Sequence, residues 1–130
     1  MVAIAHMNAG EIIGKLKVSP TARQVLDIGG GHAMYSVALC QRYPNLRSTV
    51  IDSPEALKVA EETVAAAKLS DRITLQPGNF VNDALGSAYD LALLFNIVHG
   101  FDAAQNQALV HKVAGALAPG GQIAIVEQLA

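Results

Sequence analysis

The feature of this sequence that most restricts its fold is a regular alternation of short apolar runs with segments of helical spacing. The apolar runs, which we expect to be strands, lie at Gln24–Ile28, Ser48–Asp52, Ile73–Gln76, Asp90–Asn96 and Gln122–Glu127. They lack the strict polar–apolar alternation of a strand with one face in water, and so they suit a sheet covered on both faces. The sequence therefore predicts an α/β fold with a doubly wound, Rossmann-like and mostly parallel sheet of five strands.

The segments between these runs carry apolar residues at intervals of three and four, which is typical of helices that cover a sheet. We expect helices at Ala9–Val18, His32–Tyr43, Glu55–Leu69 and Ala103–Leu117. Ser53 and Pro54 predict the start of the third helix, as an N-cap residue and a first-turn proline. Asp102, followed three positions later by Gln105, fits a capping box before the fourth. The segment Pro119-Gly120-Gly121 predicts a turn into the last strand.

Length and composition exclude several classes of function. The 130 residues, 52% of them hydrophobic, are enough for one core, so we expect a single domain over residues 1–130. The net charge of −2 and the absence of a Lys/Arg cluster argue against a nucleic-acid partner. The longest apolar run, Leu91–Phe95, is too short to span a membrane, and no signal-peptide pattern is present. Cys40 has no disulfide partner and the histidines lack metal-type spacing, so we predict a cytoplasmic location and no metal site.

Three glycines stand between the first expected strand and the next helix, in the segment Asp27-Ile28-Gly29-Gly30-Gly31-His32-Ala33. Glycines let the backbone turn sharply and approach a ligand closely, and the helix N-terminus behind them offers unpaired N–H groups. A dinucleotide-binding loop needs a small residue at position 34, which is Met34, and no Gly-Lys-Ser/Thr follows as in a P-loop. The pattern that fits is acidic-x-Gly-x-Gly-x-Gly, with Ala33 in the last place.

This pattern resembles the first motif of class I S-adenosylmethionine-dependent methyltransferases. In that family the loop holds the methionine end of the cofactor, and the acidic residue helps to bind its ammonium group, often through water. The resemblance implies cofactor-binding roles for Asp27, Gly29, Gly30 and Gly31. The chemistry is consistent, because S-adenosylmethionine carries a sulfonium and an ammonium group but no phosphate, and a carboxylate attracts cations. A tight turn that binds nothing is the alternative.

The ends of the later strands carry further candidate contacts with the cofactor. Asp52 lies roughly 20 residues beyond the glycines, where a carboxylate accepts hydrogen bonds from ribose hydroxyls in both NAD and S-adenosylmethionine folds. Its alternative role is to cap the helix that follows. Asn79 could bind the adenine amino group and Phe80 could cover the ring, although an ordinary turn also fits this segment. Ser53 and Asn96 complete the expected set, because ligands of such sheets lie beyond the carboxyl ends of the strands.

Two segments, Leu93–Asp102 (LLFNIVHGFD) and Leu117–Glu127 (LAPGGQIAIVE), resemble a narrower family, the plant-type O-methyltransferases and their bacterial relatives. In that family a histidine at the first place is the general base, and a glutamate at the end of the fifth strand orients it. The resemblance therefore implies catalytic roles for His99 and Glu127. Gly100 and Phe101 depart from the family's Asp and Trp, and a helix-entry role for His99 is the alternative.

The resemblance implies methyl transfer from S-adenosylmethionine to the oxygen of a small aromatic or hydroxyl acceptor, with S-adenosylhomocysteine as the product. It covers residues 10 to 128 and lacks the family's C-terminal antiparallel strands and N-terminal dimerisation domain. We therefore expect a partial cofactor-binding domain whose fifth strand has an open edge, and such an edge favours a homodimer. The alternatives are a truncated module that binds the cofactor or dimerises without turnover, and an NAD(P)-binding domain, against which Met34 argues.

Overall fold

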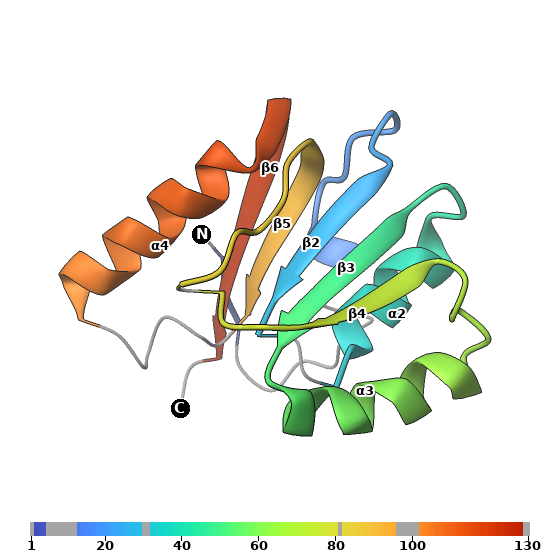
Figure 1. Cartoon of the computed structure of the whole chain (residues 1–130). Helices are drawn as coiled ribbons and strands as arrows, with labels where there is room; N and C mark the ends of the chain where they lie inside the picture. Colours follow the sequence, from blue (N-terminus) through green and yellow to red (C-terminus); the bar gives the residue numbers. More distant parts are fainter. Residues whose placement is uncertain (1, 5–12, 30–31, 81, 96–101, 129–130) are drawn as a thin grey trace.

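The computed structural model describes residues 2–4, 13–29, 32–80, 82–95 and 102–128. Its strands form one six-stranded sheet of order β1-β6-β5-β2-β3-β4. Figure 1 shows β6, β5, β2, β3 and β4 in this order. The strands are β1 (Val2–Ile4), β2 (Gln24–Ile28), β3 (Arg47–Asp52), β4 (Ile73–Pro77), β5 (Tyr89–Phe95) and β6 (Leu117–Gln128). The helices are α2 (Met34–Arg42), α3 (Pro54–Ala66) and α4 (Ala103–Gly115). Every described strand pairing is parallel, which confirms the predicted doubly wound α/β fold.

The sheet contains one strand more than the five that the sequence pattern predicts. β1 pairs in parallel with residues 126–128 of β6, at the edge that was expected to be open. A strand of three residues is too short to show a period of its own, and so no pattern marked it. Residues 122–125 of β6 have a strand partner only on the β5 side among the described residues, so the expected open edge is reduced to this stretch.

Helices cover both faces of the sheet, α2 and α3 on one side and α4 on the other (Figure 1). The alternation of side chains along the central strand β2 separates two cores. Val25 belongs to the core under α2 and α3, whereas Leu26 and Ile28 belong to the core under α4, and all three are fully buried. On the first side the strands pack against Leu39, Leu57, Ala60 and Val64, and on the second against Leu109 and Val113. Burial on both faces explains why the strand sequences are almost continuously apolar.

The helix starts agree with the capping signals in the sequence. The Ser53 side chain accepts a hydrogen bond of 3.3 Å from the Ala56 N–H at the start of α3. Asp102 and Gln105 form the predicted capping box of α4, with bonds of 2.8 Å and 3.0 Å. α2, α3 and α4 end one, three and two residues earlier than expected; after α3, Lys68 takes a left-handed φ of 59°. Of the predicted helix Ala9–Val18, residues 13–15 are helical and residues 9–12 lie outside the described residues.

The segment Pro119-Gly120-Gly121 forms an irregularity within β6 rather than a turn before it. Tyr89 pairs with Leu117 and Leu91 pairs with Gln122, so β6 contains extra residues between the two pairs. Gly120 has a φ of 80°, and a Cβ atom on Gly121 would lie 2.9 Å from the carbonyl oxygen of Ala118. Glycines are therefore needed here for the backbone to continue as a strand.

A single arginine joins the end of α2 to the strands that follow it. The Nη2 atom of Arg72 donates to the carbonyl oxygens of Cys40, Tyr43 and Leu46 at 2.9 Å, 2.9 Å and 2.8 Å. Its Nε atom donates to the Leu46 carbonyl at 3.1 Å. The last carbonyl groups of a helix have no partner within it, and here a half-buried guanidinium provides one.

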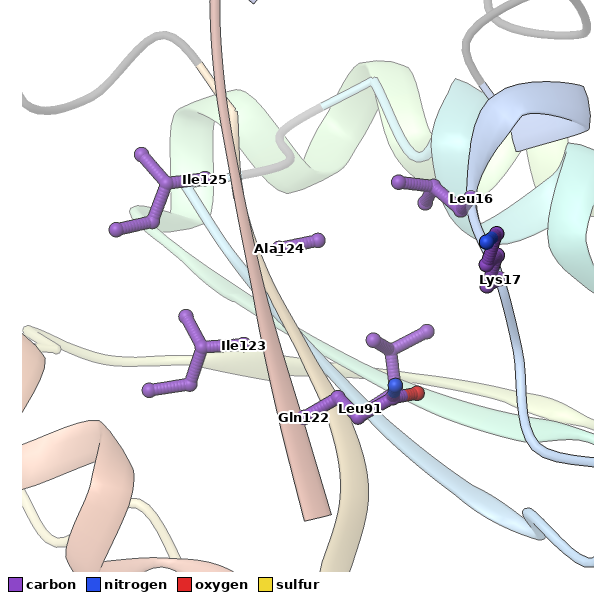
Figure 2. Close-up of a pocket in the computed structure, with 7 residues that line it drawn as sticks. All are labelled: Leu16, Lys17, Leu91, Gln122, Ile123, Ala124 and Ile125. Carbon is purple, nitrogen blue, oxygen red and sulfur yellow. The ribbon is translucent and has the colours of Figure 1, made fainter. Parts of the chain in front are cut away.

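A pocket of about 170 Å³ lies beside β6, between this strand and the segment that contains Leu16 and Lys17. Figure 2 shows Ala124 on the side of β6 that faces Leu16, with Ile123 and Ile125 on the opposite side. The pocket contains none of the residues predicted to bind a ligand, and so it is distinct from the candidate site at the strand ends.

Candidate functional site

An open cleft of about 690 Å³ lies at the carboxyl ends of β3 and β4. The residues that line it are Asp52, Ser53, Pro54, Pro77, Gly78, Asn79 and Phe80. Four of them, Asp52, Ser53, Asn79 and Phe80, are residues that the sequence predicts to contact the cofactor. The structure thus places the predicted ribose-binding and adenine-binding residues around one cleft, at the sheet edge where ligands of such folds lie.

Backbone hydrogen bonds hold the tips of β2, β3 and β4 side by side. The N–H of Gly29 donates to the Ile51 carbonyl, and the N–H of Gly78 donates to the Asp52 carbonyl, each at 3.0 Å. Oδ1 of Asp52 accepts the N–H of Ser53 at 2.7 Å, and the side chain that caps α3 is that of Ser53 rather than that of Asp52. Among the described residues Oδ2 of Asp52 has no hydrogen-bond partner. The same carboxylate therefore orders the start of α3 and still offers an acceptor to the cleft.

The wall of the cleft that carries Asn79 and Phe80 is held by two charged side chains. Oδ2 of Asp83 accepts the N–H of Asn79 at 2.8 Å. The Nζ atom of Lys112, on α4, donates to the carbonyl oxygen of Phe80 at 3.0 Å and to that of Asp83. Lys112 therefore holds this turn from α4. The local sequence around Asn79 and Phe80 does not indicate this contact.

Asp27 lies fully buried near the end of β2, the strand that pairs with β3. Its Oδ2 atom accepts a hydrogen bond of 2.6 Å from Oγ of Ser36, which in turn lies 2.7 Å from Oγ of Ser48. Its Oδ1 atom is also buried and has no hydrogen-bond partner among the described residues. Burial raises the pKa of Asp27 to about 6, against the lowering effect of the Ser36 bond, and the nearby Asp52 raises it further. Asp27 is thus a buried acid with one acceptor that no described residue satisfies.

The turn after β2 explains why the motif requires glycines. Gly29 has a φ of 71° and Ala33, in the last glycine position of the motif, has a φ of 58°. Only glycine adopts this left-handed region without strain, so Ala33 occupies a place that favours glycine. Ala33 is fully buried, whereas Met34, at the position where a dinucleotide loop needs a small residue, is 49% exposed. Gly30 and Gly31 lie outside the described residues, and their cofactor roles remain predictions.

The predicted catalytic residues, and Asn96 of the predicted cofactor-binding set, cannot be placed in the same way. Asn96 and His99 lie outside the described residues, and so does the side chain of Glu127. The backbone of Glu127 follows Val126, the partner of Phe95, so it lies where β5 ends. The roles of His99, Glu127 and Asn96 therefore remain predictions.

Two further features of the described residues bear on function. The described helices include no segment with the length and apolar character needed to cross a membrane. The described part of the chain also holds no group of three or more His, Cys, Asp or Glu side chains arranged to bind a metal ion.

The sequence matches known methyltransferases along its length. Residues 1–130 match the family model of the O-methyltransferase domain. The chain is 36% identical over 107 residues to 3-hydroxy-5-methyl-1-naphthoate 3-O-methyltransferase of Streptomyces sahachiroi, which covers 82% of this chain and 31% of that protein. It is 32% identical over 118 residues to L-tyrosine C(3)-methyltransferase of Streptomyces lavendulae, which covers 91% of this chain and 32% of that protein.

A similar fold occurs in solved structures. The O-methyltransferase family 2 protein of Planctomyces limnophilus, solved in complex with apigenin, superposes with a TM-score of 0.88 at 31% identity. The match covers 95% of this chain and 38% of that one. This chain spans about a third of the length of the two Streptomyces relatives, as their covered shares of 31% and 32% show. Because the family model covers the whole chain, and the fold agrees, this protein belongs to the O-methyltransferase domain family.

Proposed function

We propose that this domain binds S-adenosylmethionine and serves the transfer of its methyl group to the oxygen of a small aromatic or hydroxyl acceptor. The observation that carries the proposal is the clustering of Asp52, Ser53, Asn79 and Phe80 around one cleft, beside the turn that begins at Gly29. The family and the O-methyltransferase of Streptomyces sahachiroi support the same chemistry.

The residues present fit the charge of this cofactor. The described residues lining the cleft include the carboxylate of Asp52 but no lysine or arginine, which suits a cationic nucleoside better than a pyrophosphate. Asp27 adds a second carboxyl group, with a buried acceptor that has no partner among the described residues and that an ammonium group would satisfy. In this proposal Asp52 accepts the ribose hydroxyls, Asn79 and Phe80 contact adenine, and Asp27 neutralises the ammonium group. When bound, the cofactor supplies a methyl group made electrophilic by the sulfonium.

The reaction needs a base, because a hydroxyl group attacks far better after it loses its proton. We assign this role to His99, whose ring nitrogen would accept the proton, since imidazole titrates near neutrality. Glu127 would hold the ring in position. A deprotonated phenol is nucleophilic at ring carbons as well as at oxygen, and one relative is named a C-methyltransferase. Methylation of a ring carbon is therefore a second candidate, which NMR analysis of the methylated product distinguishes from O-methylation.

Titration calorimetry with S-adenosylhomocysteine and NAD, side by side, tests the proposed cofactor. We expect S-adenosylhomocysteine to bind and NAD to bind at least tenfold more weakly. Asp52→Ala should lower the affinity for S-adenosylhomocysteine by about tenfold, because hydrogen bonds to a charged acceptor are lost. Glu55→Ala, which removes an exposed carboxylate in the first turn of α3, is the matched control and should change little. Equal affinity for the two ligands, or an unaltered affinity in Asp52→Ala, would contradict the proposal.

A module that binds the cofactor without turnover is the alternative. Transfer of labelled methyl groups to a panel of phenols, compared between the unaltered chain and His99→Ala, separates the two. Transfer that is lost in His99→Ala, with affinity for S-adenosylhomocysteine retained, supports catalysis. Binding without any transfer by the unaltered chain supports the module.

We further propose a cytoplasmic homodimer. The lone and buried Cys40 is consistent with a reducing compartment, and residues 122–125 of β6 leave an edge at which another chain could pair. Analytical ultracentrifugation measures the mass in solution, and a monomer at all concentrations would rule out the dimer.

A further inference from the structure

Three buried polar side chains form a chain of hydrogen bonds that crosses from β2 through α2 to β3. Asp27 and Ser36 are 0% exposed, and Ser48 is 2% exposed. Oγ of Ser36 donates to Oδ2 of Asp27 at 2.6 Å, and the two serine Oγ atoms lie 2.7 Å apart. Buried polar groups in folded proteins nearly always have hydrogen-bond partners, and these three side chains are hydrogen-bonded to one another.

The direction of the bonds follows from the number of protons. A serine hydroxyl has one proton, and that of Ser36 is donated to Asp27. The hydroxyl of Ser48 must therefore donate to Ser36, which makes Ser36 a stronger donor. Oδ2 of Asp27 is thereby held, and Oδ1 is the oxygen left without a partner among the described residues.

We propose that Ser36, supported by Ser48, is a positioning residue for the cofactor: it keeps the Asp27 carboxylate charged and oriented so that Oδ1 remains for the ammonium group of the ligand. The inference rests on the proposed function. It adds two residues that contact neither the cofactor nor the acceptor and that act through Asp27.

The surroundings of Asp27 oppose its ionisation, so a neighbouring group that favours the charged carboxylate is needed. Burial and the neighbouring Asp52 both raise the pKa of Asp27, and the bond from Ser36 lowers it. Tyr35 also interacts electrostatically with Asp27, but a tyrosine side chain is either neutral or negatively charged, so it supplies no positive charge. The Ser36 hydroxyl is therefore the described group that favours the charged form of Asp27. Loss of this bond should raise the pKa of Asp27 and require a higher pH before the carboxylate can bind a cation.

The test is calorimetric titration of S-adenosylhomocysteine between pH 5 and 9, with the unaltered chain and with Ser36→Ala. In the unaltered chain, affinity should fall as the pH is lowered through about 6, where Asp27 takes up its proton. In Ser36→Ala the midpoint of this fall should move up by about one pH unit, and affinity at pH 5, below both midpoints, should drop by about tenfold. Ser48→Ala should act in the same direction but less, because Ser36 still donates to Asp27.

Adenosine is the control ligand because it lacks the ammonium group. Its affinity should stay within about twofold in Ser36→Ala, whereas a general distortion of the site would weaken both ligands. Asp27→Asn should remove the pH midpoint, and adding Ser36→Ala to it should shift nothing further. Should Ser36→Ala fail to fold, Ser36→Cys keeps the size of the side chain with a weaker donor and should move the midpoint in the same direction.

Two results would overturn the inference while the proposed function stands: equal losses of affinity for adenosine and S-adenosylhomocysteine, or a midpoint that does not move in Ser36→Ala. An unaltered chain that binds neither ligand at any pH would instead overturn the proposed function, and the inference with it.

Discussion

Replacement of Asp27 by Asn is expected to remove about 3 kcal/mol of pH dependence from the stability of the ligand-free protein. The pKa of Asp27 is about 6 in the folded protein, above its ordinary value of 3.8, because the carboxyl group is buried. The folded state therefore binds this proton more tightly than the unfolded state. Between pH 3.8 and about 6 the free energy of unfolding falls as the pH rises, and above about 6 the loss is complete. Each pH unit in this window corresponds to about 1.4 kcal/mol, which gives about 3 kcal/mol in all.

Urea unfolding at pH 4, 6 and 8 measures this effect. The unaltered chain should lose stability across the window, and Asp27→Asn should show a flatter profile because an amide does not titrate. Asp71→Asn, which neutralises an exposed carboxylate, is the matched control and should keep the slope of the unaltered chain. Parallel profiles of Asp27→Asn and the unaltered chain would mean that titration of Asp27 does not cause the loss of stability with rising pH. The same substitution should weaken binding of S-adenosylhomocysteine, so this residue would favour function at the expense of stability.

Arg72→Met should lower the free energy of unfolding by about 3 kcal/mol. The substitution keeps an apolar stem of similar length but removes four hydrogen bonds to the carbonyl oxygens of Cys40, Tyr43 and Leu46. Hydrogen bonds from a charged donor contribute about 1.5–3 kcal/mol each, and water can replace part of this at a half-buried site. The total is therefore well below the sum of four separate bonds.

Denaturant unfolding of Arg72→Met and of Arg47→Met provides the comparison. Arg47 is an exposed arginine whose side chain makes one hydrogen bond to the described residues, of 3.2 Å to the carbonyl of Asp71. Its replacement should change stability by about 0.5 kcal/mol or less, as is usual for surface substitutions. Equal losses in the two variants would mean that the bonds of Arg72 are no more important to the fold than a surface contact.

The elements that the sequence predicts best are those whose signals lie within a few residues. β2 has the expected bounds, Gln24–Ile28, because a short apolar run ends directly in glycine. The starts of α3 and α4 agree because Ser53 and Asp102 bond to N–H groups three positions away. β1 was missed because three residues carry no period, and its place depends on pairing with residues more than 100 positions distant.

The same distinction applies to the candidate site. The glycine turn, Asp52 and the segment Asn79-Phe80 could be predicted because each follows a strand, and parallel strands bring their carboxyl ends to one edge. The bond from Ser36 to Asp27 joins residues 9 positions apart on a strand and a helix, and Lys112 contacts Phe80 over 32 positions. No local pattern encodes such pairs.

The sequence by itself determined the alternation of β2 to β6 with the helices, the turn at Gly29 and the edge at which a ligand would lie, because neighbouring residues specify these features. Only the tertiary structure decided that Asp27 is fully buried, that one of its oxygens is held by Ser36 and that its pKa rises to about 6. The reason is physical: a charge state depends on every layer packed around the group, and packing between layers is not written in any short stretch of the chain.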